Sequence, residues 1–198
     1  MRLLSLFPSA LIIAASVCRA EGSPDVTSSE YIRLLRATRF VENFQESAAV
    51  TARVLNAREQ GNDNKYARFM SIVAKADLSD TTDCMVGVYR AQGLTHDDVI
   101  KISSFFESPL GIKLLTRSQQ MAITDIERGS HQPPPQNVFN EEERKMLAEK
   151  LQNPSIRKYG SITGNKEFSA SMFKCITESS TVKMPENSDE LRPQKSKN

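Results

Sequence analysis

The sequence predicts an all-α fold, a compact bundle of about six to eight helices that follows a cleaved signal peptide. Two observations favour this fold. Apolar residues from Tyr31 onward recur at intervals of three and four, the spacing of one helix face, whereas the alternation of β-branched residues that marks strands is scarce. A polar-capped segment at 94–113 also returns in degenerate form at 139–158, so a helix, a corner and a second helix are expected in both segments.

The N-terminal residues have the composition of a secretory signal peptide. A basic residue, Arg2, precedes an apolar run at 3–17, and Cys18 and Ala20 are small residues at the positions that signal peptidase reads. We therefore expect cleavage after Ala20, which makes residues 1–20 the signal peptide and 21–27 a flexible N-terminus. The predicted location is periplasmic or secreted.

Two other interpretations of this segment are weaker. An uncleaved anchor needs roughly twenty apolar residues, whereas this run has about fifteen and contains Pro8. A lipoprotein would carry its lipid on Cys18, but Val17 is bulky where a small residue is expected before the cysteine. We expect no stable membrane insertion once the segment is removed.

Removal of the signal peptide also balances the charge. It takes away two basic residues, Arg2 and Arg19, from the 26 in the chain and none of the 24 acidic ones, so the mature chain has 24 of each. A net charge of zero argues against general attraction to nucleic acid or to anionic membranes. We expect no nucleic-acid partner.

Cleavage leaves two cysteines, Cys84 and Cys175. An exported chain meets an oxidising compartment, so we predict a disulfide between them that closes a loop of about ninety residues. It would tie the last helix to the middle of the fold. The alternative is a pair of buried thiols that never meet.

Residues 28–178 are predicted to form one helical domain, large enough for one sizeable core. Its first helical stretch starts behind Ser28 and Ser29 as candidate caps. The apolar positions of this stretch are Tyr31, Leu34, Leu35, Val41, Phe44, Ala48, Ala52 and Leu55. The glycine and asparagine cluster at 61–64 then predicts a turn.

Two further helices follow the turn. The first, near 65–76, has one apolar face, made of Tyr66, Phe69, Met70 and Val73. The next starts behind Ser79 and ends at Gly93, where glycine suits the left-handed end of a helix. Its apolar side carries Cys84, Met85 and Val88.

A tight corner between two helices is predicted at 107–109. Thr95 caps a helix from 96 and forms a capping box with Asp98. That helix stops at Glu107, because a proline disfavours helical geometry in the residue before it, and Ser108 and Pro109 begin a new helix. The buried side of the first helix is Val99 or Ile100 with Ile102, Phe105 and Phe106.

The second helix of the corner carries Gly111 in its first turn, where the missing side chain would allow close helix contact. Its stripe continues through Leu114, Leu115, Ser118, Met121, Ala122 and Ile126. Beyond it, 128–138 contains Gly129 and three prolines and is predicted to be a stiff extended connector.

The second helical unit spans 139–178. Asn140 is its cap, and a last helix lies near 165–177. The unit's apolar face has fewer residues than that of the first unit: Met146, Leu147, Leu151, Ile156 and Tyr159. The remaining residues, 179–198, mix Lys, Glu, Asn, Ser and Pro and are predicted to be a disordered tail. Between the two units only Pro109/Pro154 and Lys113/Lys158 are identical, so duplication and coincidence both stay open.

Catalytic chemistry is not visible in the sequence. His96 and His131 lack metal-ligand spacing, and the chain has neither a Gly-x-Ser-x-Gly nucleophile elbow nor a glycine-rich phosphate loop. We predict no catalytic, metal or cofactor residue. A secreted hydrolase with a site assembled across loops is one alternative, and a carrier of a lipid or small ligand, which needs an internal apolar cavity, is another.

The corner supplies the candidate interaction residues: Phe105, Phe106, Gly111 and Lys113. The two phenylalanines cannot both face one narrow core stripe, so one of them is either covered by the second unit or exposed in an interaction groove. Lys113 is either a solvated lysine beside the corner or a docking charge for a partner.

The segment at 105–113, Phe-Phe-Glu-Ser-Pro-Leu-Gly-Ile-Lys, resembles the Phe-aromatic-x-Ser-Pro-x-Gly-x-Lys signature of bacterial exported proteins in the domain of unknown function 2059 family. The resemblance extends more loosely over 28–127. It implies an all-α, exported or periplasmic protein without an established activity. We therefore expect a non-enzymatic protein that acts on an unidentified protein partner in the bacterial periplasm or cell envelope, its oligomeric state left open.

Overall fold

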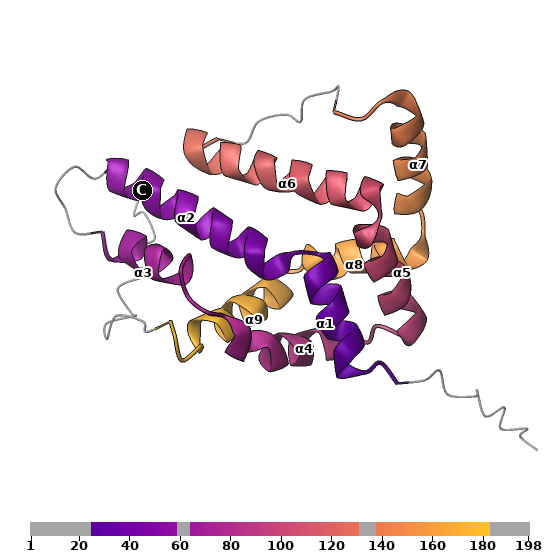
Figure 1. Ribbon diagram of the computed structural model, residues 1–198, viewed down its shortest axis with the longest axis horizontal. Helices are drawn as coiled ribbons and strands as arrows, with labels where there is room; N and C mark the ends of the chain where they lie inside the picture. The colour runs from indigo at the N-terminus through magenta and orange to yellow at the C-terminus, as the bar shows by residue number, and fades with distance from the viewer. Residues whose placement is uncertain (1–24, 59–63, 131–137, 183–198) are drawn as a thin grey trace, which may run out of the picture.

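The computed structural model describes residues 25–58, 64–130 and 138–182 (Figure 1). These residues form α-helices and one short 3-10 helix, with no strand among them. The all-α prediction is confirmed. The helices are α1 (Ser28–Ala37), α2 (Phe40–Arg58), α3 (Lys65–Val73), η1 (Ser79–Thr81), α4 (Thr82–Arg90), α5 (His96–Glu107), α6 (Pro109–Arg128), α7 (Glu141–Leu151), α8 (Pro154–Thr163) and α9 (Lys166–Thr177).

The core gathers around α1, which contacts α4 and α5, while α8 and α9 close the bundle from the second unit. Aromatic rings connect these helices. Tyr89 of α4 stacks on Tyr31 and on Tyr159, each with ring centroids 6.4 Å apart, and Phe168 meets it edge-on. The two predicted units therefore share one core.

The first predicted helical stretch is two helices, because the chain bends between α1 and α2. Thr38 is buried, and its hydroxyl donates to the carbonyls of Leu34 and Leu35. Arg39 then takes a left-handed conformation with φ of 50°. The helix count therefore exceeds the expected six to eight, with nine α-helices among the described residues.

Three local predictions are wrong. Thr27, rather than Ser28 or Ser29, caps α1, because Thr27 and Glu30 form a reciprocal capping box. Tyr66 was expected on the apolar face of α3, yet its side chain is 39% exposed. Ser79 caps no α-helix, since it opens the 3-10 helix that precedes α4.

The predicted disordered tail begins too early. Ser179 and Ser180 donate hydrogen bonds to the carboxylate of Asp80, and Val182 is 3% exposed. Residues 179–182 are thus packed against η1 and the core. The rest of the predicted tail, the signal peptide and the proline-rich part of the connector lie outside the described residues.

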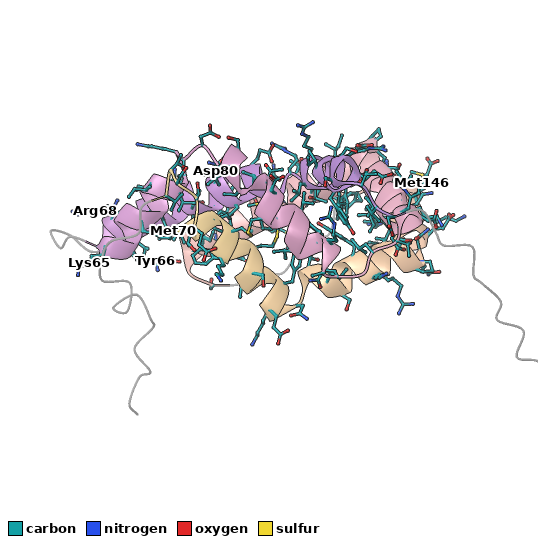
Figure 2. The ribbon with its side chains drawn as sticks, turned by 90° about the horizontal axis from the view of Figure 1, so that it is seen from below. Lys65, Tyr66, Arg68, Met70, Asp80 and Met146 are labelled. Atoms are coloured by element: carbon teal, nitrogen blue, oxygen red, sulfur yellow. A yellow bond between two sulfur atoms is a disulfide. The ribbon has the colours of Figure 1, made fainter. Side chains whose placement is uncertain are left out.

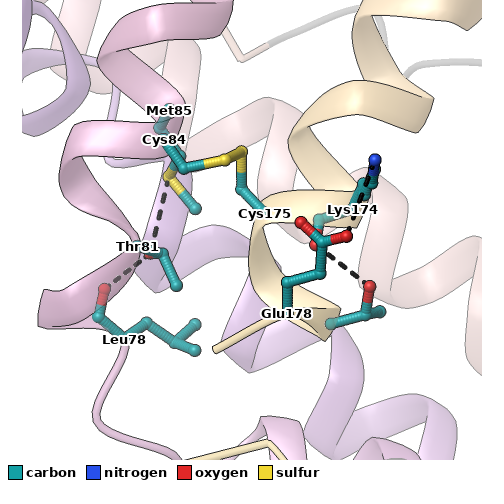
Figure 3. The surroundings of a disulfide bond; sticks show 8 residues. Leu78, Thr81, Cys84, Met85, Lys174, Cys175 and Glu178 are labelled. Atoms are coloured by element: carbon teal, nitrogen blue, oxygen red, sulfur yellow. Dashed lines mark hydrogen bonds and ion pairs between the residues drawn. A yellow bond between two sulfur atoms is a disulfide. The ribbon is translucent and has the colours of Figure 1, made fainter. Parts of the chain in front are cut away.

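A disulfide joins Cys84 of α4 to Cys175 of α9, with an S–S distance of 2.00 Å and the two Cα atoms 5.7 Å apart (Figure 3). The prediction of one bridge between the two cysteines agrees with this geometry. The bond spans 91 residues and attaches the end of the second unit to the middle of the first. No helix within the described ranges has the length and apolar content needed to cross a membrane.

The helices at the edges of the bundle are less covered than the core. α6 runs beside α2 (Figure 1), and only Gly111 among its residues is buried. Its expected stripe is broken, because Ser118 and Ala122 are exposed. α7 stands at one end of the molecule, contacts α8, and buries no side chain.

Candidate interaction groove

The corner between α5 and α6 forms as the sequence predicted. Thr95 caps α5 in a reciprocal capping box with Asp98, and α5 ends at Glu107. Ser108 then serves both helices: its hydroxyl donates to the carbonyl of Phe105 at 2.6 Å and accepts from the amide of Gly111 at 3.1 Å. These local bonds fix the angle at which α6 leaves α5.

Gly111 is required by the closeness of the two helices. A Cβ atom placed there would lie 2.0 Å from the carbonyl oxygen of Phe105 and 2.7 Å from the Cα of Phe106. Both neighbours are backbone atoms, which cannot rotate away as a side chain can. The close contact predicted for Gly111 is therefore present.

The paired aromatics are both core residues, each 7% exposed. Phe106 reaches the second unit, where its ring meets Tyr159 edge-on with a centroid separation of 5.4 Å. Phe105 packs on Phe106 at 5.0 Å and also lines a groove at the surface. Of the alternatives that the sequence left open, burial under the second unit applies to Phe106.

Lys113 has a partner within the chain. Its Nζ lies 2.7 Å from both carboxylate oxygens of Glu143 and 5.3 Å from the centre of the Phe139 ring. Glu143 is also the capping-box acid of α7, where its side chain accepts from the amide of Asn140. Lys113, at the corner of the first unit, therefore binds the first turn of α7 in the second unit.

The matching lysine of the second unit makes the reciprocal contact. Lys158 lies 2.9 Å from the carboxylate of Asp98, the capping-box acid of α5, and donates to the carbonyl of Gly93 at 2.8 Å. Each lysine thus pairs with the acid at the equivalent cap of the other unit. This cross-pairing is a relation between the two units that their shared sequence pattern did not reveal.

The two cap acids are held in their ionised form. Partial burial opposes the charge on Asp98, but hydrogen bonds from Lys158, Ser155 and Thr95 outweigh it and keep the pKa of Asp98 well below its usual value. The pKa of Glu143 is also lowered, by the hydrogen bond from Lys113 and then by that from the Asn140 amide. Both contacts between the units are therefore charge-assisted at neutral pH.

A groove of about 740 Å³ opens where the two units meet. Its walls come from α5, the start of α6, α7 and the start of α8. The lining residues are Ile100, Lys101, Ser104, Phe105, Ser108, Pro109, Leu110, Lys113, Glu143, Met146, Lys150, Asn153 and Ile156. The groove is mainly apolar, and Met146 at its edge is 41% exposed.

The charged residues of the groove are mostly basic. Lys101, Lys113 and Lys150 line it against a single acid, Glu143, which Lys113 already binds. Lys101 pairs with Asp97 one turn earlier on its own helix. Lys150 is exposed and makes no ion pair within the part of the chain that the structure describes.

The sequence located only part of this groove. Phe105 and Lys113 line it, whereas Phe106 lies behind it in the core and Gly111 lies in the helix contact. Met146, Lys150 and Ile156 were not predicted as site residues, because they belong to the second unit and no local pattern places them beside α5. The available signal was that Met146 and Lys150 lie four residues apart, on the same side of α7.

Of the two histidines, the one within the described residues is His96, and it lies outside the groove. The Nδ1 of His96 is 2.7 Å from the carboxylate of Glu30, which joins α5 to α1 outside the groove. His131 lies outside the described residues. Among the residues whose positions are given, no group of three His, Cys, Asp or Glu side chains could hold a metal ion.

No protein-family model matches the chain, and comparisons with curated proteins and with solved structures found no match either. The resemblance of 105–113 to the domain of unknown function 2059 family therefore stays a prediction from those residues.

Proposed function

We propose that this is an exported, non-enzymatic helical protein that binds a protein partner through the groove between its two units. The observation that carries the proposal is an open, mainly apolar groove of about 740 Å³ with Met146 exposed at its edge. Exposed apolar surface rimmed by charged groups is typical of an interaction site.

The position of α7 supports this role. The helix buries no side chain fully: Leu147 is half-buried against the core, whereas Met146 is exposed and lines the groove. Methionine suits a binding surface because its flexible, polarisable side chain adapts to different partners. An α7 that served only the fold would be expected to cover Met146 as well as Leu147.

Export is supported by two independent features. Arg2 and the apolar run at 3–17 have the composition of a signal peptide. The disulfide between Cys84 and Cys175 fits an oxidising compartment, where such bonds persist. Together with the resemblance of the corner to a bacterial exported family, these features favour the periplasm, the cell envelope or the medium as the place of action.

The alternatives receive less support from the groove. A hydrolase would need an uncommitted acid-base group in the cleft, whereas Glu143 there is bonded to Lys113 and caps α7, and His96 faces Glu30 outside it. A lipid carrier would need an enclosed apolar cavity, whereas this groove is open and an ion pair between Lys113 and Glu143 lies within it.

Site-specific photo-crosslinking tests the proposal. A photoreactive amino acid replaces Met146 in the groove or, as the matched control, Tyr66, which is equally exposed at 39% and lies at the other end of the molecule (Figure 2). In the native envelope fraction, position 146 should crosslink to a discrete protein that position 66 does not reach. Equal products from both positions, or none from 146, would refute the groove as the binding site.

A further inference from the structure

The charges of the groove indicate what kind of segment it takes. The lining has three lysines, Lys101 and Lys113 from one unit and Lys150 from the other, and a single acid. The mature chain as a whole is predicted to be neutral, so this excess is local to the groove. A local basic excess over an apolar surface complements a ligand that is apolar on one side and acidic on the other.

Glu143 is an example of a carboxylate bound in the groove. Its two oxygens are each 2.7 Å from the Nζ of Lys113, and its side chain is 23% exposed. The groove thus already accepts one carboxylate beside its apolar surface. Lys150 makes no ion pair within the described residues, and Lys101, although its Nζ is bonded to Asp97 on its own helix, keeps further N–H donors for a partner.

We propose that the groove binds an acidic amphipathic segment of a partner protein, with apolar side chains against Phe105, Met146 and Ile156 and carboxylates toward Lys101 and Lys150. This inference rests on the proposed function, because it names the chemistry of the partner in the same groove. A helix with apolar residues three and four positions apart and acidic residues beside them has the required arrangement.

The test uses three fluorescein-labelled peptides of about fourteen residues, a length of roughly four helical turns. One has leucine at helical spacing with glutamate at the flanking positions, the second has lysine in place of glutamate, and the third has the composition of the first with the leucine spacing scrambled. Fluorescence anisotropy measures their binding to the full mature protein with its disulfide intact. The acidic amphipathic peptide should bind, and its affinity should fall as salt screens the charges.

Two matched substitutions on α7 identify the charge effect. Lys150→Glu places the opposite charge in the groove, and Lys145→Glu makes the same change on the same helix outside the lining residues. Lys150→Glu should weaken the acidic peptide about tenfold, whereas Lys145→Glu should change its affinity by less than about twofold. Circular dichroism melting of each variant checks that the fold is intact.

A neutral substitution separates this inference from the proposed function. Met146→Gln removes apolar surface without adding charge and should weaken the acidic peptide about fivefold. If Lys150→Glu and Lys145→Glu act alike, or if the basic peptide binds as well as the acidic one, the acidic specificity is overturned. The groove still stands in that case if Met146→Gln weakens binding or if position 146 crosslinks a partner. Failure of the acidic peptide to bind also overturns the inference.

Discussion

Replacing Gly111 with alanine should destabilise the protein, although alanine usually stabilises a helix. The new Cβ would lie 2.0 Å from the Phe105 carbonyl oxygen and 2.8 Å from the carbonyl carbon. Relief requires α5 and α6 to move apart, which loosens the core around Phe106. Such overpacking costs about 1–3 kcal/mol, here toward the upper end because backbone blocks backbone. The helix propensity of alanine offsets about 1 kcal/mol.

The net expectation is a loss of about 2 kcal/mol for Gly111→Ala, measured as a lower urea midpoint at unchanged slope. Gly160→Ala in α8 is the matched control, because a Cβ there has no neighbour within 4 Å. It should gain about 0.5–1 kcal/mol. A Gly111→Ala protein that unfolds at the wild-type urea concentration or above would refute the steric reasoning.

Three further predictions concern the disulfide, a cap acid and the bend after α1. Replacing Cys84 and Cys175 with serine opens a loop of 91 residues and should lower the free energy of unfolding by about 4 kcal/mol. A urea midpoint equal to that of the oxidised wild type would contradict this. Ionised Asp98 stabilises the fold, because hydrogen bonds from Lys158 and Ser155, working against partial burial, lower its pKa. That stability is present at neutral pH and is lost as pH falls below about 4, so the melting temperature of Asp98→Asn should lie below wild type at pH 7 and approach it in acid. A constant difference across that range would show that the charge of Asp98 is not responsible. Arg39→Gly relieves the left-handed backbone at φ of 50° and should raise the free energy of unfolding by about 0.5–1 kcal/mol, a gain that a lower urea midpoint would rule out.

The sequence predicted the corner well because its signals are local. The cap Thr95, the helix end at Glu107 and the start at Pro109 all depend on hydrogen bonds and steric rules within four residues. The bend at Arg39 escaped prediction for the opposite reason. No glycine or proline marks it, and the backbone there is held by burial of Thr38 in the packed core.

Contacts between the two units could not be predicted from local patterns. The sequence left Lys113 open between a solvated lysine and a docking charge, because Glu143 lies 30 positions away and becomes its neighbour only in the folded protein. The burial of Phe106 likewise depends on Tyr159. The groove therefore depends on tertiary structure. Of its lining, the sequence predicted only residues of α5 and α6.

Chemical-shift mapping tests the central claim most directly. The isotope-labelled protein is titrated with the acidic amphipathic peptide, and the backbone amide shifts of the helices are followed. We predict that the changes concentrate on α5 and α7, around Lys101, Met146 and Lys150, while α3 at the other end of the molecule stays unchanged. Changes concentrated on α3, or spread evenly over all helices, would contradict the assignment of binding to the groove.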